Sequence, residues 1–250
     1  MLVGDKAVMG PVELTVRDLA GMLEFYQRSI GLKLLQRTGN IASLGVSDQV
    51  LLTLLEDRQA RHPGRTTGLY HVAILLPSRV ALARQLNHLV KTGVYLQGAA
   101  DHLVSEALYL ADPEGNGLEL YRDRPRSQWP HEHGQLRMAS DPLDIDGLLA
   151  EPQLHSEPWN GLPDGTVMGH VHLRVSDLPD AENFYRTVLG MDIMVRFGHS
   201  ASFLSYGGYH HHIGINTWGS LGRPPAPTGS QGLKADVPAN CGASHRDCEQ

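Results

Sequence analysis

The 250-residue sequence has few cysteines, no excess of basic residues and no long apolar run. Both cysteines, Cys241 and Cys248, lie near the end of the chain, so no disulfide can join the parts of a fold that precedes them. The 21 Lys and Arg against 27 Asp and Glu give a net charge of −6, which argues against a protein that coats nucleic acid. No apolar run approaches the roughly 20 residues of a membrane span, and the first residues lack the apolar segment of a secretory signal. We therefore expect a cytoplasmic protein with neither nucleic acid nor a membrane as partner.

Two features are present instead. Hydrophobic residues make up 41% of the chain, enough to build a buried core. The sequence also holds 14 histidines, three of them consecutive at positions 210–212. Because imidazoles bind metals and transfer protons near neutral pH, this cluster is a candidate for chemistry.

An internal repeat organises the chain. Residues 9–37 and 168–196 are identical at 11 of 29 positions at a constant offset of 159, without a gap. In both copies the opening apolar residues alternate, which is typical of a half-buried strand. Asp18 and Asp177 stand where the N-cap of a helix is expected, and Gly31 and Gly190 stand where that helix would end. Further apolar strands follow, so the predicted unit is β-α-β-β-β.

A more distant copy lies between these two. It has a strand at 70–76, a helix at 79–92, a turn at 112–117 and a closing strand at 118–121. The three modules then span 8–57, 68–123 and 166–218. The predicted fold is α+β: an N-terminal domain of two modules at 8–123 that pair into a cup-shaped sheet, then an incomplete second pair. Residues 124–165 are predicted to form a linker with a short helix at 143–150. Residues 219–250 are predicted to be an irregular or disordered tail, in which a fourth module is missing.

These motifs resemble the vicinal oxygen chelate superfamily, which includes glyoxalases, bleomycin-resistance proteins and extradiol dioxygenases. The resemblance is carried by V-x-L-x-V-x-D-L at 12–19 and 171–178 and by D-P-E-G-N-G-L-E-L-Y at 112–121. The C-terminal H-H-x-I-G-x-N-T-W at 210–218 looks most like a catechol 2,3-dioxygenase. Members of this superfamily pair their modules so that curved sheets enclose a cup.

The resemblance implies a metal site built from the first and last strands of modules. Two histidines and one glutamate hold the metal in the extradiol pattern, and open positions remain for O₂ and a catechol. His170 matches the first ligand. The second histidine and the glutamate have no counterpart in 232–250, and Pro11 cannot coordinate at the equivalent place in the first module.

Three other histidines of the third module are candidate site residues. The resemblance assigns His212 to the histidine that acts as acid and base beside the bound O₂. His210 and His212 face one way on a predicted strand while His211 faces the other. His172 and His210 are candidate substrate-binding residues, although His172 could equally well be merely solvated, and a solvated edge-strand cluster is the alternative for His212.

A separate N-terminal site remains open. His71 opens the second module and Glu119 closes it, so the two form a plausible ligand pair, with Glu13 as a weak third. In extradiol members the N-terminal pair of modules is usually a vestigial scaffold. We therefore favour a structural role for His71 and Glu119.

Three functions are compatible with these patterns. The first is an Fe(II)-dependent extradiol ring-cleavage dioxygenase in the breakdown of aromatic compounds, impaired if the missing module is needed. The second is a glyoxalase-type isomerase or lyase with Mn, Ni or Zn at His71 and Glu119, and the third is a non-catalytic binder without metal. The expected partners are a small catechol-like substrate and O₂. A homodimer is also expected, because the third module alone would expose its concave face.

Overall fold

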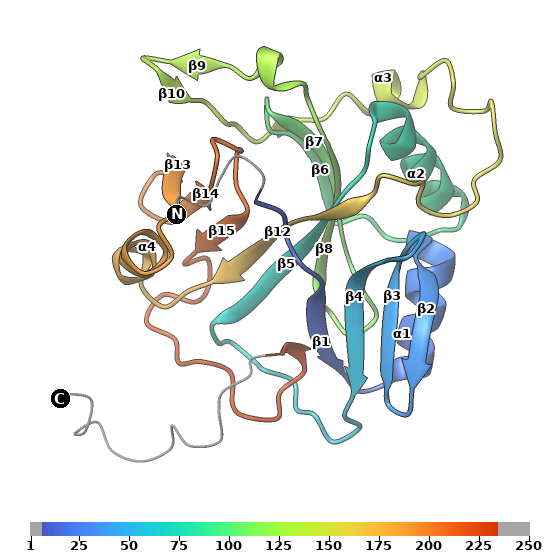
Figure 1. Ribbon diagram of the computed structural model, residues 1–250, viewed down its shortest axis with the longest axis horizontal. Coiled ribbons are helices and arrows are strands. Elements are labelled where there is room, and N and C mark those ends of the chain that lie inside the picture. The colour runs from blue at the N-terminus through green and yellow to red at the C-terminus, as the bar shows by residue number, and fades with distance from the viewer. Residues whose placement is uncertain (1–6, 235–250) are drawn as a thin grey trace.

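Three copies of the repeated unit are present in the computed structural model, which describes residues 7–234 (Figure 1). The expected α+β class and the β-α-β-β-β order are confirmed. The first module consists of β1 (Val12–Val16), α1 (Leu19–Phe25), a π-helical turn (Tyr26–Ile30), β2 (Lys33–Thr38), β3 (Ile41–Val46) and β4 (Gln49–Glu56). The second consists of β5 (Gly68–Leu75), α2 (Arg79–Lys91), β6 (Gly98–Asp101), β7 (Ser105–Ala111) and β8 (Gly117–Asp123). The third consists of β12 (Val167–Arg174), α4 (Leu178–Thr187), β13 (Asp192–Phe197), β14 (Ala201–Ser205) and β15 (Ile213–Asn216).

Local sequence signals explain where the helices begin and end. The Asp18 carboxylate accepts a hydrogen bond from the Gly21 N–H at 3.1 Å, and Asp177 caps α4 in the same way at 2.8 Å. Each cap satisfies a backbone N–H that has no partner within the helix. Gly31 ends the first helix with φ at 92°, a left-handed conformation that glycine adopts without strain.

The connection between the second and third modules wraps around the outside of the molecule. It contains the short strands β9 (His131–Glu132), β10 (Gln135–Leu136) and β11 (Asp141–Pro142) and the helix α3 (Ile145–Leu149). The helix predicted at 143–150 is therefore confirmed. The side chain of Leu148 is fully buried in the main core, so this segment contributes to packing and is more than a tether.

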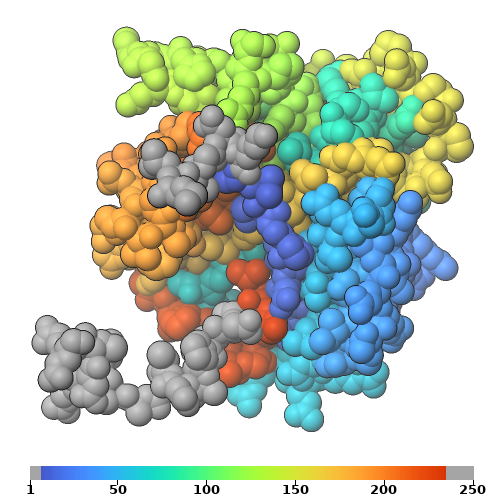
Figure 2. All heavy atoms as spheres, in the orientation of Figure 1, coloured from blue at the N-terminus to red at the C-terminus, as the bar shows by residue number. Residues whose placement is uncertain are grey.

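Two sheets organise the fold. A nine-stranded sheet has the order β11-β6-β7-β8-β5-β12-β15-β14-β13, and a five-stranded sheet has the order β16-β1-β4-β3-β2. The second and third modules share the larger sheet, where β5 pairs antiparallel with β12. Figure 2 shows the third module, in orange, and the first module, in blue, on opposite sides of the visible face. The first described residues of the chain run between them.

The module pairing differs from the one expected from the sequence. The sequence grouped the first and second modules into one cup, whereas in the structure the second module joins the third. All three modules carry the same alternation, so local pattern does not decide which two meet. The central residues of β5 and β12 are continuously buried, as in strands that are covered on both faces. The third module thus pairs with the second within the same chain, and the expected homodimer stays a prediction.

The end of the described chain adds one strand to the smaller sheet. The two-residue strand β16 (Gly232–Leu233) pairs antiparallel with β1. Between residues 219 and 234 no fourth module is formed, as the sequence predicts, whereas the expectation for 235–250 lies outside the described residues. Within residues 7–234, every helix is too short or too polar to cross a bilayer.

Candidate metal centre

His71, Glu119 and His170 form one buried cluster, although they come from three strands and two modules. Glu119 Oε2 lies 2.9 Å from His71 Nε2 and 3.1 Å from His170 Nε2. One potential ligand atom from each residue lies within 4.8 Å of the other two. The three side chains are between 1% and 7% exposed. The sequence placed His170 and the pair His71 and Glu119 in different sites, and the structure unites them in one.

Strand register brings these side chains together. Ala73 on β5 is paired with Glu119 on β8 on one side and with His170 on β12 on the other. Paired residues on neighbouring strands point to the same face of a sheet, and so does His71, two residues before Ala73. The methyl group of Ala73 leaves the centre of this row open for the larger side chains around it.

Two glycines make room for this arrangement. The β5–β12 ladder shifts register between Met168 and His170, which is the mark of a β-bulge and re-aims the side chain that follows. A Cβ on Gly169, within this bulge, would lie 1.9 Å from the hydroxyl of Tyr121. Gly117 is paired with His71, and a Cβ there would lie 2.2 Å from a backbone carbonyl oxygen. A larger residue would displace the buried ring of Tyr121 in the first case and the backbone of β5, which carries His71, in the second.

The third module provides no second carboxylate. His172 and Gly214 on β12 and β15 occupy the positions that Ala73 and Glu119 occupy on β5 and β8. A Cβ on Gly214 would lie 2.8 Å from Cγ of His172, because the imidazole fills the space beside this glycine. The cluster therefore offers three potential ligands, with a glycine where the repeat would place a fourth.

The protonation states suit metal binding. Burial lowers the pKa of His170 to about 4, although the Glu119 charge opposes this shift. Burial alone would raise the pKa of Glu119, but the hydrogen bond from His170 and the nearby imidazoles of His170 and His71 hold it well below its usual range. At neutral pH, His170 is accordingly a neutral imidazole and Glu119 a carboxylate. These are the forms in which both side chains bind metals.

Unsatisfied nitrogen atoms show that the residues fit a metal ion. His71 Nε2 and His170 Nδ1 are buried and have no hydrogen-bond partner. His71 Nε2 is close to Glu119 Oε2, yet the two atoms are not aligned for a hydrogen bond. Such orphaned buried atoms are costly in a fold, and a shared divalent ion would satisfy the nitrogen of His71. Two imidazoles and one carboxylate are the donor set of non-haem iron sites with open positions.

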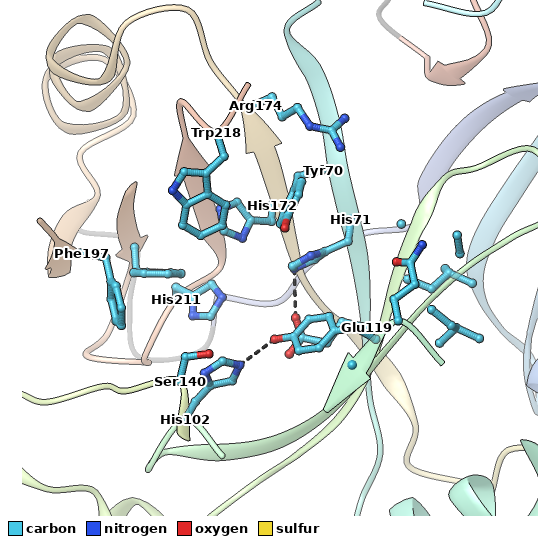
Figure 3. A pocket seen from close by; sticks show the side chains of 18 of the residues that line it. Tyr70, His71, His102, Glu119, Ser140, His172, Arg174, Phe197, His211 and Trp218 are labelled. Carbon is cyan, nitrogen blue, oxygen red and sulfur yellow. Dashed lines mark hydrogen bonds and ion pairs between the residues drawn. The ribbon is translucent and has the colours of Figure 1, made fainter. Parts of the chain in front are cut away.

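The cluster opens onto a cavity of about 530 Å³ (Figure 3). His71 and Glu119 line this cavity. One part of its wall is aromatic and the other carries polar side chains. The aromatic part consists of Tyr70, Phe197, Phe203 and Trp218, and the polar part includes His102, Tyr109, Ser140, His172 and His211.

Tyr109 and His102 form a hydrogen-bonded pair in the polar wall. His102 Nδ1 lies 2.7 Å from the Ala139 carbonyl oxygen, and a carbonyl only accepts, so this nitrogen carries the proton. His102 Nε2 lies 2.6 Å from the Tyr109 hydroxyl, and in the uncharged form of the ring this nitrogen accepts a hydrogen bond from that hydroxyl. Tyr109 is paired with Glu119 across the β7–β8 hairpin. Burial and then the Glu119 charge raise the pKa of Tyr109 well above its usual value, which keeps the phenol neutral.

The three other predicted site residues, His172, His210 and His212, lie in three different places. His172 lines the cavity, and burial lowers its pKa well below the usual range. His210 is fully buried behind the cavity wall and is hydrogen-bonded to Asp123 and His211. His212, expected to move protons, lines a separate cavity of about 240 Å³. Residues 206–212 form no regular strand, so the alternation assumed for the three histidines does not hold there.

Sequence reasoning missed His211, His102 and Tyr109. The predicted alternation did set His211 opposite to His210 and His212, and it is His211 that faces the cavity. The turn at 112–117 could have revealed Tyr109, because a tight antiparallel turn fixes the pairs on either side of it. Counting back from that turn puts residue 109 opposite Glu119, as the register shows.

Comparisons with known proteins agree with this architecture. The model of the Glyoxalase/Bleomycin resistance protein/Dioxygenase superfamily matches residues 8–120 and 167–226. A catechol-2,3-dioxygenase of Bacillus subtilis (strain 168) is 46% identical over 230 residues, which cover 90% of this chain and 80% of the relative. The expected resemblance to a catechol 2,3-dioxygenase is thus confirmed.

Solved structures share the fold at low sequence identity. Glyoxalase I from Zea mays matches with a TM-score of 0.54 and 17% identity, over 90% of this chain and 71% of the other. A candidate dioxygenase from Bacillus subtilis subsp. subtilis str. 168 matches with a TM-score of 0.54 and 14% identity. That match covers 85% of this chain and 64% of the other, so this chain spans less than two thirds of that structure's length.

Proposed function

Because the chain belongs to the Glyoxalase/Bleomycin resistance protein/Dioxygenase superfamily, we propose that it is an Fe(II)-dependent extradiol dioxygenase that opens the ring of a catechol. The observation that carries this proposal is the cluster of His71, Glu119 and His170. It supplies two imidazoles and one carboxylate, and Gly214 stands where a fourth ligand would be. The 46% identity to a catechol-2,3-dioxygenase of Bacillus subtilis supports the same assignment.

The three-ligand set suits a reaction with two small reactants. Bound Fe(II) would supply open positions at which a catechol and O₂ are brought together and activated. His71, Glu119 and His170 would hold this ion on one side and leave its other side directed at the cavity. The net reaction adds both atoms of O₂ to the catechol and breaks a ring C–C bond beside a hydroxyl-bearing carbon, so the metal and the protein are unchanged at the end.

The cavity wall suits a planar aromatic substrate. Tyr70, Phe203 and Trp218 offer ring faces and edges against which a catechol ring can pack. The cavity of about 530 Å³ also lies within the range of small-molecule sites. We therefore propose a single-ring catechol, with or without a small substituent, as the substrate class. Such a reaction belongs to the breakdown of aromatic compounds.

Two side chains are available to handle the substrate's protons. Burial lowers the pKa of His211 well below its usual range, so its imidazole is neutral and can accept a proton from a ring hydroxyl. The Tyr109 hydroxyl donates to His102, which leaves its oxygen able to accept a hydrogen bond from the second ring hydroxyl. In this proposal His211 takes the proton-transfer role that the sequence gave to His212.

The cluster of His71, Glu119 and His170 bears on the two alternative functions. The isomerase hypothesis assumed that His71 and Glu119 act without His170, but all three lie in one cluster. Loss of metal from His71→Ala therefore does not distinguish the isomerase reaction from the dioxygenase reaction. The non-catalytic hypothesis assumed a cup that lacks half its wall, whereas β5 and β12 join two modules into one sheet.

The decisive experiment measures metal content and O₂ consumption together. The protein is purified without oxygen, freed of metal, and reloaded with Fe(II), Mn(II), Ni(II) or Zn(II) in parallel. We expect the Fe(II) form to consume one O₂ per catechol and to release a yellow ring-opened product, with the Zn(II) form as the matched inactive control. An Fe(II)-loaded protein that consumes no O₂ with catechol or its methyl and carboxyl derivatives would overturn the proposal. Isomerisation of a thiol–aldehyde adduct by the Ni(II) or Zn(II) form would support the glyoxalase-type alternative.

A further inference from the structure

A chain of hydrogen bonds connects His211 to a carboxylate outside the metal cluster. Asp123 Oδ1 lies 2.8 Å from His210 Nε2, and His210 Nδ1 lies 2.8 Å from His211 Nδ1. At the other end, the ring centroid of His211 lies 4.0 Å from that of His170. Asp123 is four residues after Glu119 on β8, so one strand carries both a potential metal ligand and the end of this chain.

The carboxylate of Asp123 determines which nitrogen donates and which accepts in each of these hydrogen bonds. A carboxylate accepts hydrogen bonds, so His210 Nε2 carries a proton and donates it to Asp123. In a neutral imidazole the other nitrogen is then an acceptor, which makes His210 Nδ1 the acceptor for His211. His211 Nδ1 must therefore carry the proton of that bond. Its Nε2 is left unprotonated, and no hydrogen bond engages that atom within residues 7–234.

The surroundings of His210 protect this arrangement from water. The His210 side chain is fully buried, and its ring centroid lies 4.1 Å from that of Tyr209 and 5.4 Å from that of Trp129. Hydrogen bonds in such a dry environment are stronger than those exposed to solvent, and a group left without a partner there is costly. His210 consequently has little freedom to reverse its donor and acceptor.

We infer that Asp123 and His210 are positioning residues, which hold the His211 ring in its Nδ1–H tautomer and keep Nε2 as a proton acceptor. The catalytic meaning of this inference rests on the proposed function, whereas the tautomer itself does not. The principle is that of a catalytic histidine whose tautomer is set by a carboxylate behind it. Here a second histidine is inserted between the carboxylate and the working imidazole.

The first test reads the tautomer directly in metal-free protein. Long-range ¹H–¹⁵N NMR on histidine-labelled protein distinguishes Nδ1–H from Nε2–H, and the His211→Asn variant identifies the resonances of residue 211. We expect His211 to be the Nδ1–H form in the unaltered protein. An Nε2–H form would overturn the inference, whatever reaction the protein catalyses.

The second test replaces the accepting carboxylate of Asp123 with an amide that can donate a hydrogen bond. In Asp123→Asn the side-chain amide can donate a hydrogen bond to His210 Nε2. The donor and acceptor roles of His210 and His211 can then be exchanged. We expect the His211 resonances to shift to the Nε2–H form or to a mixture of both. With iron content unchanged, kcat for catechol should fall roughly 10- to 100-fold, as for other outer partners of site residues, while KM changes less. A changed tautomer with an unchanged kcat would overturn the catalytic meaning of the inference.

Matched variants distinguish a positioning role of Asp123 and His210 from a general loss of structure. His210→Gln keeps one donor for Asp123 and one acceptor for His211, so we expect the Nδ1–H form to persist. His210→Leu offers neither the donor nor the acceptor, and in this variant His211 should no longer be held in the Nδ1–H form. Glu182→Gln alters a carboxylate that binds Arg196 and Ser202 elsewhere in the third module, and should change neither the tautomer nor kcat. If all these variants lack ring-cleaving activity, as does the unaltered Fe(II) form, the proposed function fails while the tautomer result still stands.

Discussion

His71 and His170 lie on the first strands of two different modules, and their ring centroids are 5.5 Å apart. Both have an imidazole nitrogen within 3.1 Å of the same oxygen of Glu119. This relationship makes the second and third modules interdependent, because neither one holds all three potential ligands. It also determines which experiments separate the possible functions.

Removal of either histidine is expected to abolish metal binding. His71→Ala and His170→Ala each leave two of the three potential ligands. Fe(II) affinity should therefore fall by more than the roughly 10- to 100-fold that is typical when a residue hydrogen-bonded to a metal ligand is substituted. Metal titration by calorimetry or spectroscopy measures the loss. The control is His155→Ala, which alters an exposed histidine in the linker. Retention of iron by either variant, with the protein folded, would contradict a shared site.

Substitution of Gly214 is expected to act through His172. In Gly214→Ala the new Cβ would lie 2.8 Å from Cγ of His172, and crowding of this kind typically costs about 1–3 kcal/mol. Urea unfolding of metal-free protein measures the free energy of unfolding. In the His172→Ala background the same substitution should cost much less, because the crowded ring is absent. Equal costs in both backgrounds would show that the crowding lies elsewhere.

Loss of the Tyr109 hydroxyl is expected to slow the reaction without releasing the metal. Tyr109 is hydrogen-bonded to His102 and paired with Glu119, but it is not one of the three clustered ligands. In Tyr109→Phe, kcat should fall by roughly 100-fold or more if the hydroxyl assists proton transfer, with iron content unchanged. Steady-state O₂ uptake measures this, and Tyr95→Phe at an 81% exposed position is the control. A kcat within about twofold of the unaltered protein would exclude the role.

Metal-free protein is expected to lose stability in mild acid. Burial lowers the pKa of His170 from 6.5 to about 4, so between these values the unfolded chain binds more protons than the folded chain. The free energy of unfolding should therefore fall as pH drops from about 6.5 to 4, by about 3 kcal/mol for this group. Burial lowers the pKa of His172 and His211 in the same direction. Urea unfolding at several pH values measures the slope, which should be smaller in His170→Asn. A slope that His170→Asn leaves unchanged would assign the acid sensitivity to other groups.

Much of the fold was predictable because its determinants are local. The repeated alternation of apolar residues and the caps Asp18 and Asp177 define three modules without any knowledge of their contacts. The resemblance to the superfamily also implied His71, Glu119 and His170 as potential ligands, since each stands on the first or last strand of its module. The sequence could not show that these three meet.

Tertiary structure alone decided the composition of the site. Every module presents a similar strand edge, so the partner of the second module depends on long-range packing of β5 against β12, which no local pattern encodes. Which of His211 and His212 lines the cavity beside the cluster depends on an irregular segment that precedes β15, where alternation no longer predicts direction. A sequence specifies periodic elements residue by residue, but the docking of distant strands is a property of the whole core.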